Sequence, residues 1–130
     1  MSRMDLRFGW VLRGAGALTL TLMLAAFAPQ MALRLTFGAG VQGGLAEVIV
    51  RSWGMLVGLV GAGMIFAAGH PTLHRFAAGM AVLGKLWFIG LLLTLGRGFL
   101  PVATGSLIID SSVVMALSAC LYATRGRARV

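Results

Sequence analysis

The sequence predicts an all-α integral membrane protein that forms a four-helix bundle, with residues 1–130 as one transmembrane domain. Three observations predict this class: hydrophobic residues make up 59% of the chain, charged residues make up only 11%, and the apolar residues fall into four long stretches. A soluble domain of this size needs about 25% charged residues to solvate its surface. A helix crosses the hydrocarbon core of a bilayer with about 20 apolar residues, so four spans leave no room for a second domain.

The four predicted spans are 10–28, 46–68, 76–95 and 103–123. Proline or glycine residues, which interrupt helices, separate them. The apolar stretches lack the alternation of a membrane β-strand, and helices satisfy their own backbone hydrogen bonds in lipid. The first stretch also has signal-peptide features, because Arg3 and Arg7 precede it and Ala26-Phe27-Ala28 resembles a cleavage site. Its length favours a retained helix.

The segment 29–45 is predicted to be the outer loop. Apolar and polar residues alternate through its first half, which includes Met31, Leu33 and Phe37, and this half is consistent with a short helix lying on the membrane surface. The glycine-rich second half has no such pattern, and we expect it to be flexible.

Arginines in the short connections predict the orientation, because cytoplasmic loops carry an excess of basic residues. The basic residues concentrate on one side of the predicted topology: Arg3, Arg7, Arg13, Arg75, Arg125, Arg127 and Arg129. Both termini are therefore predicted to be cytoplasmic. The Arg- and Gly-rich, Lys-poor composition is typical of a GC-rich bacterial genome, so we expect a multi-pass protein of the bacterial inner membrane. The basic tail favours anionic headgroups, and no nucleic-acid recognition motif accompanies it.

Four charged residues lie inside the apolar stretches: Glu47, Arg51, Lys85 and Asp110. Ionisable groups at such depth are costly and indicate a functional site or a paired network. Their formal charges sum to zero, and Glu47 precedes Arg51 by four positions, the favourable order for a helical ion pair. At about 1.5 Å of rise per residue, Arg51, Asp110 and Lys85 lie roughly 8, 10 and 15 Å into their spans. We therefore expect one outward-facing cluster.

Helical spacing predicts which faces point inward. In the second span Glu47, Arg51 and three glycines form one stripe, whose small residues allow close helix packing. Comparable stripes contain Lys85 in the third span and Asp110 in the fourth. The expected bundle is closed at its cytoplasmic end and polar toward the outside. The expected neighbours of the charges are Trp53, Trp87, Ser106, Ser111 and Met55.

Other chemistry receives little support from the sequence. His70 and His74 have metal-ligand spacing, but Pro71 and a loop position argue against a metal site. Cys120 is the single cysteine, so the chain has no intramolecular disulfide and no Cys-x-x-Cys redox centre. No catalytic or nucleotide-binding motif is present. We therefore predict no enzyme activity, no catalytic residue, no metal and no cofactor.

Several local patterns resemble one family of membrane proteins. Pro29 closes the first span, Arg51-Ser52-Trp53-Gly54 opens the second, Lys85-Leu86-Trp87-Phe88 lies in the third and Ile109-Asp110 in the fourth. The combination resembles the small bacterial four-helix proteins of the DoxX-like grouping, some of which are membrane subunits of quinone-linked oxidoreductases. The resemblance implies a membrane partner or accessory role.

Three functions remain open at this point. The first is a small inner-membrane binding or accessory subunit, whose charge cluster binds a lipophilic or anionic ligand such as a quinone or lipid headgroup. The second is a proton-coupled transporter of small molecules, functioning as a dimer. The third is a structural membrane subunit in which the charges fix the register of the helices. The expected partners are the lipid bilayer, a membrane protein or a second copy of the chain, and a lipophilic ligand, with no nucleic acid.

Overall fold

The computed structural model describes residues 2–126, which contain α-helices and short 3₁₀ turns but no strands. The helices are α1 (Arg3–Leu20), α2 (Leu24–Phe27), α3 (Pro29–Phe37), α4 (Gly44–Ala68), α5 (His74–Thr94) and α6 (Leu100–Ala123), joined in part by the 3₁₀ turns η1 (Thr21–Met23), η2 (Pro71–Leu73) and η3 (Arg97–Phe99). Four helical segments are long and apolar enough to span a membrane: Arg3–Phe27, Gly44–Ala68, Pro71–Thr94 and Arg97–Ala123. The predicted fold class, an all-helical multi-pass membrane protein, is confirmed at this level.

The first helix begins at Arg3, well before the apolar stretch that marks it in the sequence. Ser2 caps it: the Ser2 hydroxyl accepts a hydrogen bond from the Asp5 backbone N–H, and an Asp5 carboxylate oxygen accepts one from the Ser2 backbone N–H. This reciprocal arrangement satisfies donors that a helix start leaves free. Hydropathy alone could not locate this start, because the capping residues are polar.

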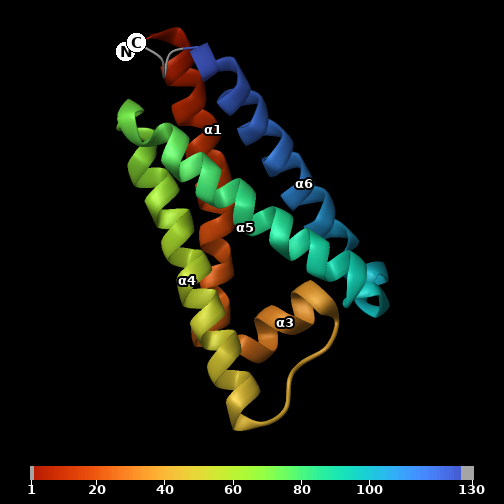
Figure 1. Cartoon of the computed structure of the whole chain (residues 1–130). Coiled ribbons are helices and arrows are strands. Elements are labelled where there is room, and N and C mark those ends of the chain that lie inside the picture. Colours follow the sequence, from red (N-terminus) through yellow and green to blue (C-terminus); the bar gives the residue numbers. More distant parts are fainter. Residues whose placement is uncertain (1, 127–130) are drawn as a thin grey trace.

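The long helices form two pairs that diverge from one end of the molecule (Figure 1). Helices α1 and α4 pack along each other, and α5 and α6 form the second pair. The pairs meet at the end where α1 begins and α6 finishes, and they spread apart toward the opposite end. Helix α3 turns back across the widening space between them.

Glycines allow α1 and α4 to pack with their backbones close together. A Cβ atom on Gly61 of α4 would lie 2.5 Å from the backbone nitrogen of Leu20 in α1, and one on Gly54 would lie 2.6 Å from that of Ala26 in α2, which continues the same span. Real Cβ atoms do not approach this closely, so only glycine fits at these positions. The inward-facing glycine stripe predicted for this span is confirmed, since Gly54, Gly58 and Gly61 are all buried.

The apolar core lies where the two pairs meet. Its largest fully buried side chains are Phe8, Leu12, Met64 and Leu117. The buried ring of His74 lies 4.9 Å from that of Phe8, and its Nε2 is within hydrogen-bond distance of a backbone carbonyl at the end of α4, that of Ala68. The convergent end of the bundle is therefore filled with side chains, whereas the divergent end leaves space between the helices.

Helix α3 begins at a sharp corner, where Pro29 follows Ala28, a residue outside the helical conformation. It ends at Gly38, whose φ of 72° is the left-handed conformation that favours glycine. Phe37 lies 6.2 Å from Phe88 of α5 and 6.0 Å from Phe99 of η3, measured between ring centroids. The short helix predicted in this segment is therefore present, and aromatic contacts attach its end to the second helix pair.

Candidate functional site

A cavity of about 280 Å³ occupies the space between the two helix pairs. Each long helix and α3 contributes to its wall, and most of the contributing side chains are apolar. Leu18 and Leu22 come from the first span, Val57 and Val60 from α4, and Phe88 from α5. The volume lies just below the range of about 300–1,000 Å³ that is typical of small-molecule sites.

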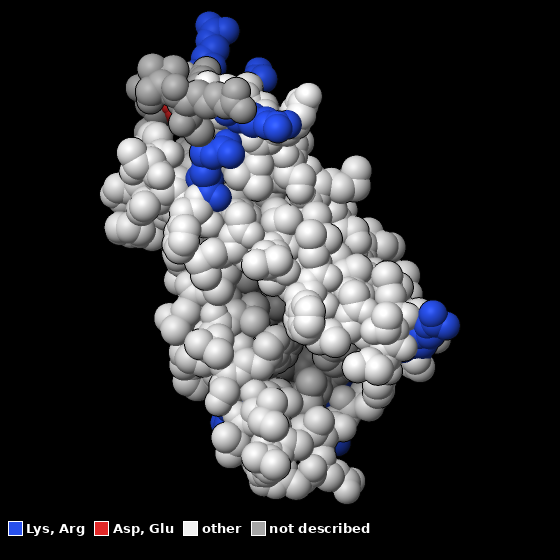
Figure 2. Space-filling view, in the orientation of Figure 1, with Lys and Arg blue, Asp and Glu red and all other residues white. Residues whose placement is uncertain are grey.

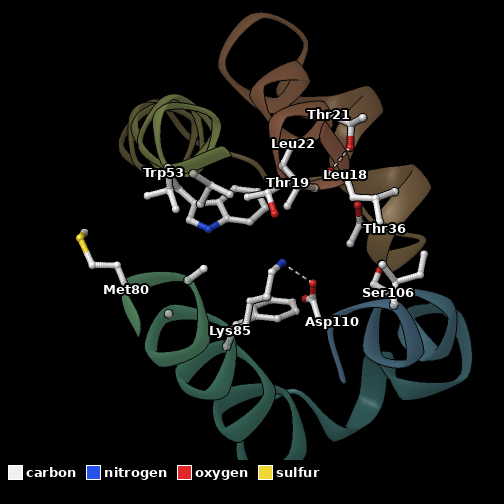
Figure 3. Close-up of a pocket in the computed structure, with 16 residues that line it drawn as sticks. Leu18, Thr19, Thr21, Leu22, Thr36, Trp53, Met80, Lys85, Ser106 and Asp110 are labelled. Atoms are coloured by element: carbon white, nitrogen blue, oxygen red, sulfur yellow. Dashed lines mark hydrogen bonds and ion pairs between the residues drawn. The ribbon is translucent and has the colours of Figure 1, made fainter. Parts of the chain in front are cut away.

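An ion pair between Lys85 of α5 and Asp110 of α6 lies in the wall of this cavity (Figure 3). Lys85 Nζ donates to Asp110 Oδ1 over 2.6 Å, and the two side chains are only 11% and 13% exposed. The pair forms because both residues lie on the inward stripes of their helices, on which Ala81 and Val113 are also buried. A charged pair with so little solvent around it has a large electrostatic effect on anything that enters the cavity.

Three further polar side chains face the cavity without a partner in the described part of the chain. They are Trp53 of α4, Thr36 of α3 and Ser106 of α6. Figure 3 shows the indole nitrogen of Trp53 directed into the cavity. The Thr19 hydroxyl also lies at the wall, but it donates to the carbonyl of Ala15 over 2.8 Å. The cavity therefore combines apolar walls with hydrogen-bonding groups that are free to meet a ligand.

Glu47 and Arg51 form a second, separate ion pair. Arg51 Nη2 lies 2.8 Å from Glu47 Oε1, and the two side chains are 45% and 44% exposed. Arg51 Nη1 also donates to the carbonyl of Ala26 over 3.0 Å. The last turn of a helix leaves its carbonyls without helical partners, so Arg51 stabilises the end of α2 beside the corner at Pro29.

The expected single cluster of four charges is therefore corrected to two pairs. Lys85 and Asp110 line the cavity, whereas Glu47 and Arg51 do not. Arg51 was expected to lie near Asp110 because the two residues have similar depths in their spans. The corner between α2 and α3, which hydropathy does not reveal, supplies Arg51 with backbone carbonyls instead.

The expected neighbours of the charges also divide into two groups. Trp53 and Ser106 line the cavity, as predicted, but Trp87 is 72% exposed and lies outside it. Trp87 follows Lys85 by two positions, and a helix turns about 200° over two residues, so it points away from the pair. Met55 borders a shallow surface depression beside Arg51, and Ser111 is outside the cavity wall.

Sequence reasoning missed several residues of the wall, notably Thr36, Met80 and Gly84. Thr36 reaches the cavity because α3 folds back, and no periodic pattern in the sequence indicates this. Met80 and Gly84 were detectable in principle, because they precede Lys85 by five positions and one position and flank its face of the helix. Hydropathy gives no reason to select them among many apolar neighbours.

The two histidines have structural contacts rather than a shared ligand geometry. His74 is buried against Phe8, as described above, while the ring of His70 stacks on Phe66 with a centroid distance of 4.5 Å. Within residues 2–126 no group of three His, Cys, Asp or Glu side chains is placed to hold a metal ion.

No family model, curated protein or solved structure matches the chain, so the resemblance to the DoxX-like grouping stays a prediction.

Proposed function

We propose that the protein is a small binding or accessory subunit of the bacterial inner membrane, and that its cavity holds a lipophilic molecule with a polar head, such as a quinone or a lipid. The observation that most strongly supports this proposal is the Lys85–Asp110 pair, a nearly buried ion pair in the wall of a mostly apolar cavity. Apolar walls with a few convergent polar groups are typical of small-molecule sites.

The distribution of basic side chains along the molecule supports a cytoplasmic location for both ends of the chain. Figure 2 shows basic side chains gathered at the end of the molecule where α1 begins and α6 finishes. By their positions in the chain and their contacts, Arg3, Arg7, Arg75 and Arg125 lie at this end. The excess of Lys and Arg in cytoplasmic segments orients membrane proteins. Arg127 and Arg129 lie outside the described residues. With this orientation the cavity lies in the half of the protein nearer the periplasm.

The test uses the Asp110→Asn variant in lipid nanodiscs, with Ser112→Ala as the matched control. Ser112 lies on the same helix, where its hydroxyl donates to the carbonyl of Ile108 outside the cavity wall. Binding of a short-chain benzoquinone and of a monoacylglycerol is followed by the fluorescence of Trp53, after Trp10 and Trp87 are changed to Phe. We expect Asp110→Asn to retain the helical fold and to weaken binding of at least one probe about tenfold, which corresponds to about 1.4 kcal/mol.

The other two functions give different results in the same experiment. A transporter predicts that proteoliposomes containing the unmodified chain dissipate an imposed pH gradient and that Asp110→Asn abolishes this. A purely structural pair predicts that neither probe binds to any form of the protein, and that Asp110→Asn only lowers the melting temperature in detergent. Either result would contradict the proposed binding function.

A further inference from the structure

We infer that the cavity opens sideways to the lipid between α4 and α5, and that it takes the neutral, hydrogen-bond-accepting head of a single-chain lipid whose tail stays in the bilayer. The inference rests on the proposed function and specifies the ligand class and the path to the same site.

The opening lies between the two helix pairs, where the molecule is hollowed. Figure 2 shows this hollow, and the rim formed by α4 and α5 carries no charged side chain in that view. Trp53 and Val57 line the cavity on the α4 side, and Met80 and Gly84 line it on the α5 side. Met80 is 50% exposed. In an apolar helical protein, an uncharged opening on this flank faces hydrocarbon rather than water.

Gly84 leaves one position on the α5 side of the opening without a side chain. A Cβ atom at Gly84 would meet nothing within 4 Å. Its lack of a side chain therefore does not serve close helix packing, in contrast to Gly54 and Gly61 of α4. At the cavity wall, this open space provides room for a guest.

The size of the cavity limits how much of a ligand it can enclose. A volume of about 280 Å³ is below that of typical sites for drug-sized ligands. It accommodates a polar head and the first part of one chain. The remainder of the chain must leave through the opening, where lipid provides an apolar environment at little cost.

The polar groups of the cavity define the chemistry of the head. Lys85 and Asp110 neutralise each other at 2.6 Å, so an anionic head would have to compete with the Asp110 carboxylate. A neutral head leaves the pair intact. The Trp53 indole N–H is a donor only, and the hydroxyls of Thr36 and Ser106 can also donate. Carbonyl and hydroxyl oxygens on the ligand would satisfy these groups.

The experiment measures quenching of Trp53 by a monoacylglycerol whose stearoyl chain is dibrominated. The full chain, with Trp10 and Trp87 changed to Phe, is placed in nanodiscs of non-brominated phosphatidylcholine. Bromine quenches tryptophan only at short range, so a bound chain gives saturable quenching, whereas free probe in the bilayer gives a linear background. We expect saturable quenching, with affinity for the neutral probe at least tenfold higher than for dibrominated stearate.

Two substitutions in α5 test whether the ligand enters through the opening between α4 and α5. Gly84→Leu places a side chain in the opening, whereas Gly90→Leu places one on an exposed part of α5 outside the cavity wall. We expect Gly84→Leu to weaken saturable quenching at least tenfold and Gly90→Leu to leave it unchanged. Gly84→Ala, which adds little volume, should remain close to the unmodified protein. If Gly84→Leu does not fold, Met80→Phe narrows the same opening without adding a second tryptophan, and it carries the same expectation.

The outcomes separate a wrong path from a wrong function. Equal binding by the Gly84→Leu and Gly90→Leu variants, together with weakened binding by Asp110→Asn, would overturn the sideways opening and leave the proposed site intact. Tighter binding of dibrominated stearate than of the brominated monoacylglycerol would contradict the inferred preference for a neutral head. The absence of saturable quenching by either brominated probe would overturn the inference, and the proposed function would then depend on the benzoquinone.

Discussion

At the scale of single residues, Lys85 and Asp110 matter because each would be costly without the other. Their side chains are almost out of contact with solvent, and they come from different helices. Desolvation disfavours an unpaired charge strongly in such a place. The pair therefore links α5 to α6 and at the same time brings charge to the cavity wall.

Removal of one member of the pair should destabilise the protein more than removal of both. We expect Lys85→Met to lower the free energy of unfolding by about 3 kcal/mol, because it leaves Asp110 as an uncompensated charge. The double variant Lys85→Met with Asp110→Leu should recover most of this loss. Unfolding in mixed detergent micelles measures both values. Equal losses for the single and double variants would show that the cavity hydrates its charges well enough to make pairing unimportant.

The sequence predicts some of these residues because helical spacing is simple. Lys85, Asp110 and Ser106 could be placed on inward faces, and the structure brings all three to the cavity. Residue type alone does not distinguish Trp87 from Trp53 as a neighbour of the ion pair. The helical turn per residue does, because it places Trp87 on the side of α5 opposite Lys85. The ion pair of Arg51 with Glu47 follows from their spacing of four positions. The hydrogen bond from Arg51 to the Ala26 carbonyl was not predictable, because it depends on a corner 25 residues earlier in the chain.

At the scale of elements, α4 has two different faces, and its glycines show the difference. Gly61 lies against the backbone of α1, whereas a Cβ atom at Gly63 would meet nothing within 4 Å. Small residues at a helix contact permit close backbone approach, which is a main source of attraction between helices in lipid. The same residue type therefore has a packing role at one position and none two positions later.

Leucine substitutions at Gly61 and Gly63 should affect the stability of the protein very differently. Gly61→Leu should destabilise the protein by about 1–3 kcal/mol or more, because the side chain must force α1 away from α4. Gly63→Leu should leave stability nearly unchanged, because its side chain enters open space on the outer face. Thermal melting in detergent compares them directly. Similar melting temperatures for the two variants would contradict the packing of α1 on α4.

Hydropathy predicts the long helices well because each must satisfy a single requirement, an apolar length that crosses the bilayer. It predicts their ends less well, as the start of α1 at Ser2 and Arg3 shows. The short helix in 29–45 was also predicted, from the alternation of apolar and polar residues in its first half. Its direction was not, because the contact of Phe37 with Phe88 and Phe99 joins segments far apart in the sequence.

At the scale of the whole molecule, the two helix pairs are tightly joined at one end and separated at the other (Figure 1). Large side chains such as Phe8, Met64 and Leu117 fill the joined end. Helix α3 then occupies part of the separated end, and the remaining space is the cavity. The location of the site is thus a consequence of unequal filling along the bundle.

The proposed orientation predicts which parts of the chain are accessible from each side of the membrane. In a Cys120→Ala background, Gln42→Cys lies in the connection before α4 and Gly126→Cys follows α6. A maleimide that does not cross membranes should label Gln42→Cys in intact spheroplasts, and Gly126→Cys only after permeabilisation. The positive-inside bias of the arginines is the physical reason. The reverse labelling pattern would overturn the cytoplasmic placement of both ends.

The most direct test of the central claim is an experimental structure of the protein extracted with its native lipid. We predict elongated density that begins beside Trp53 and the Lys85–Asp110 pair and leaves the protein between α4 and α5. Helices α4 and α5 in contact across this region, or a cavity that contains only water, would contradict it.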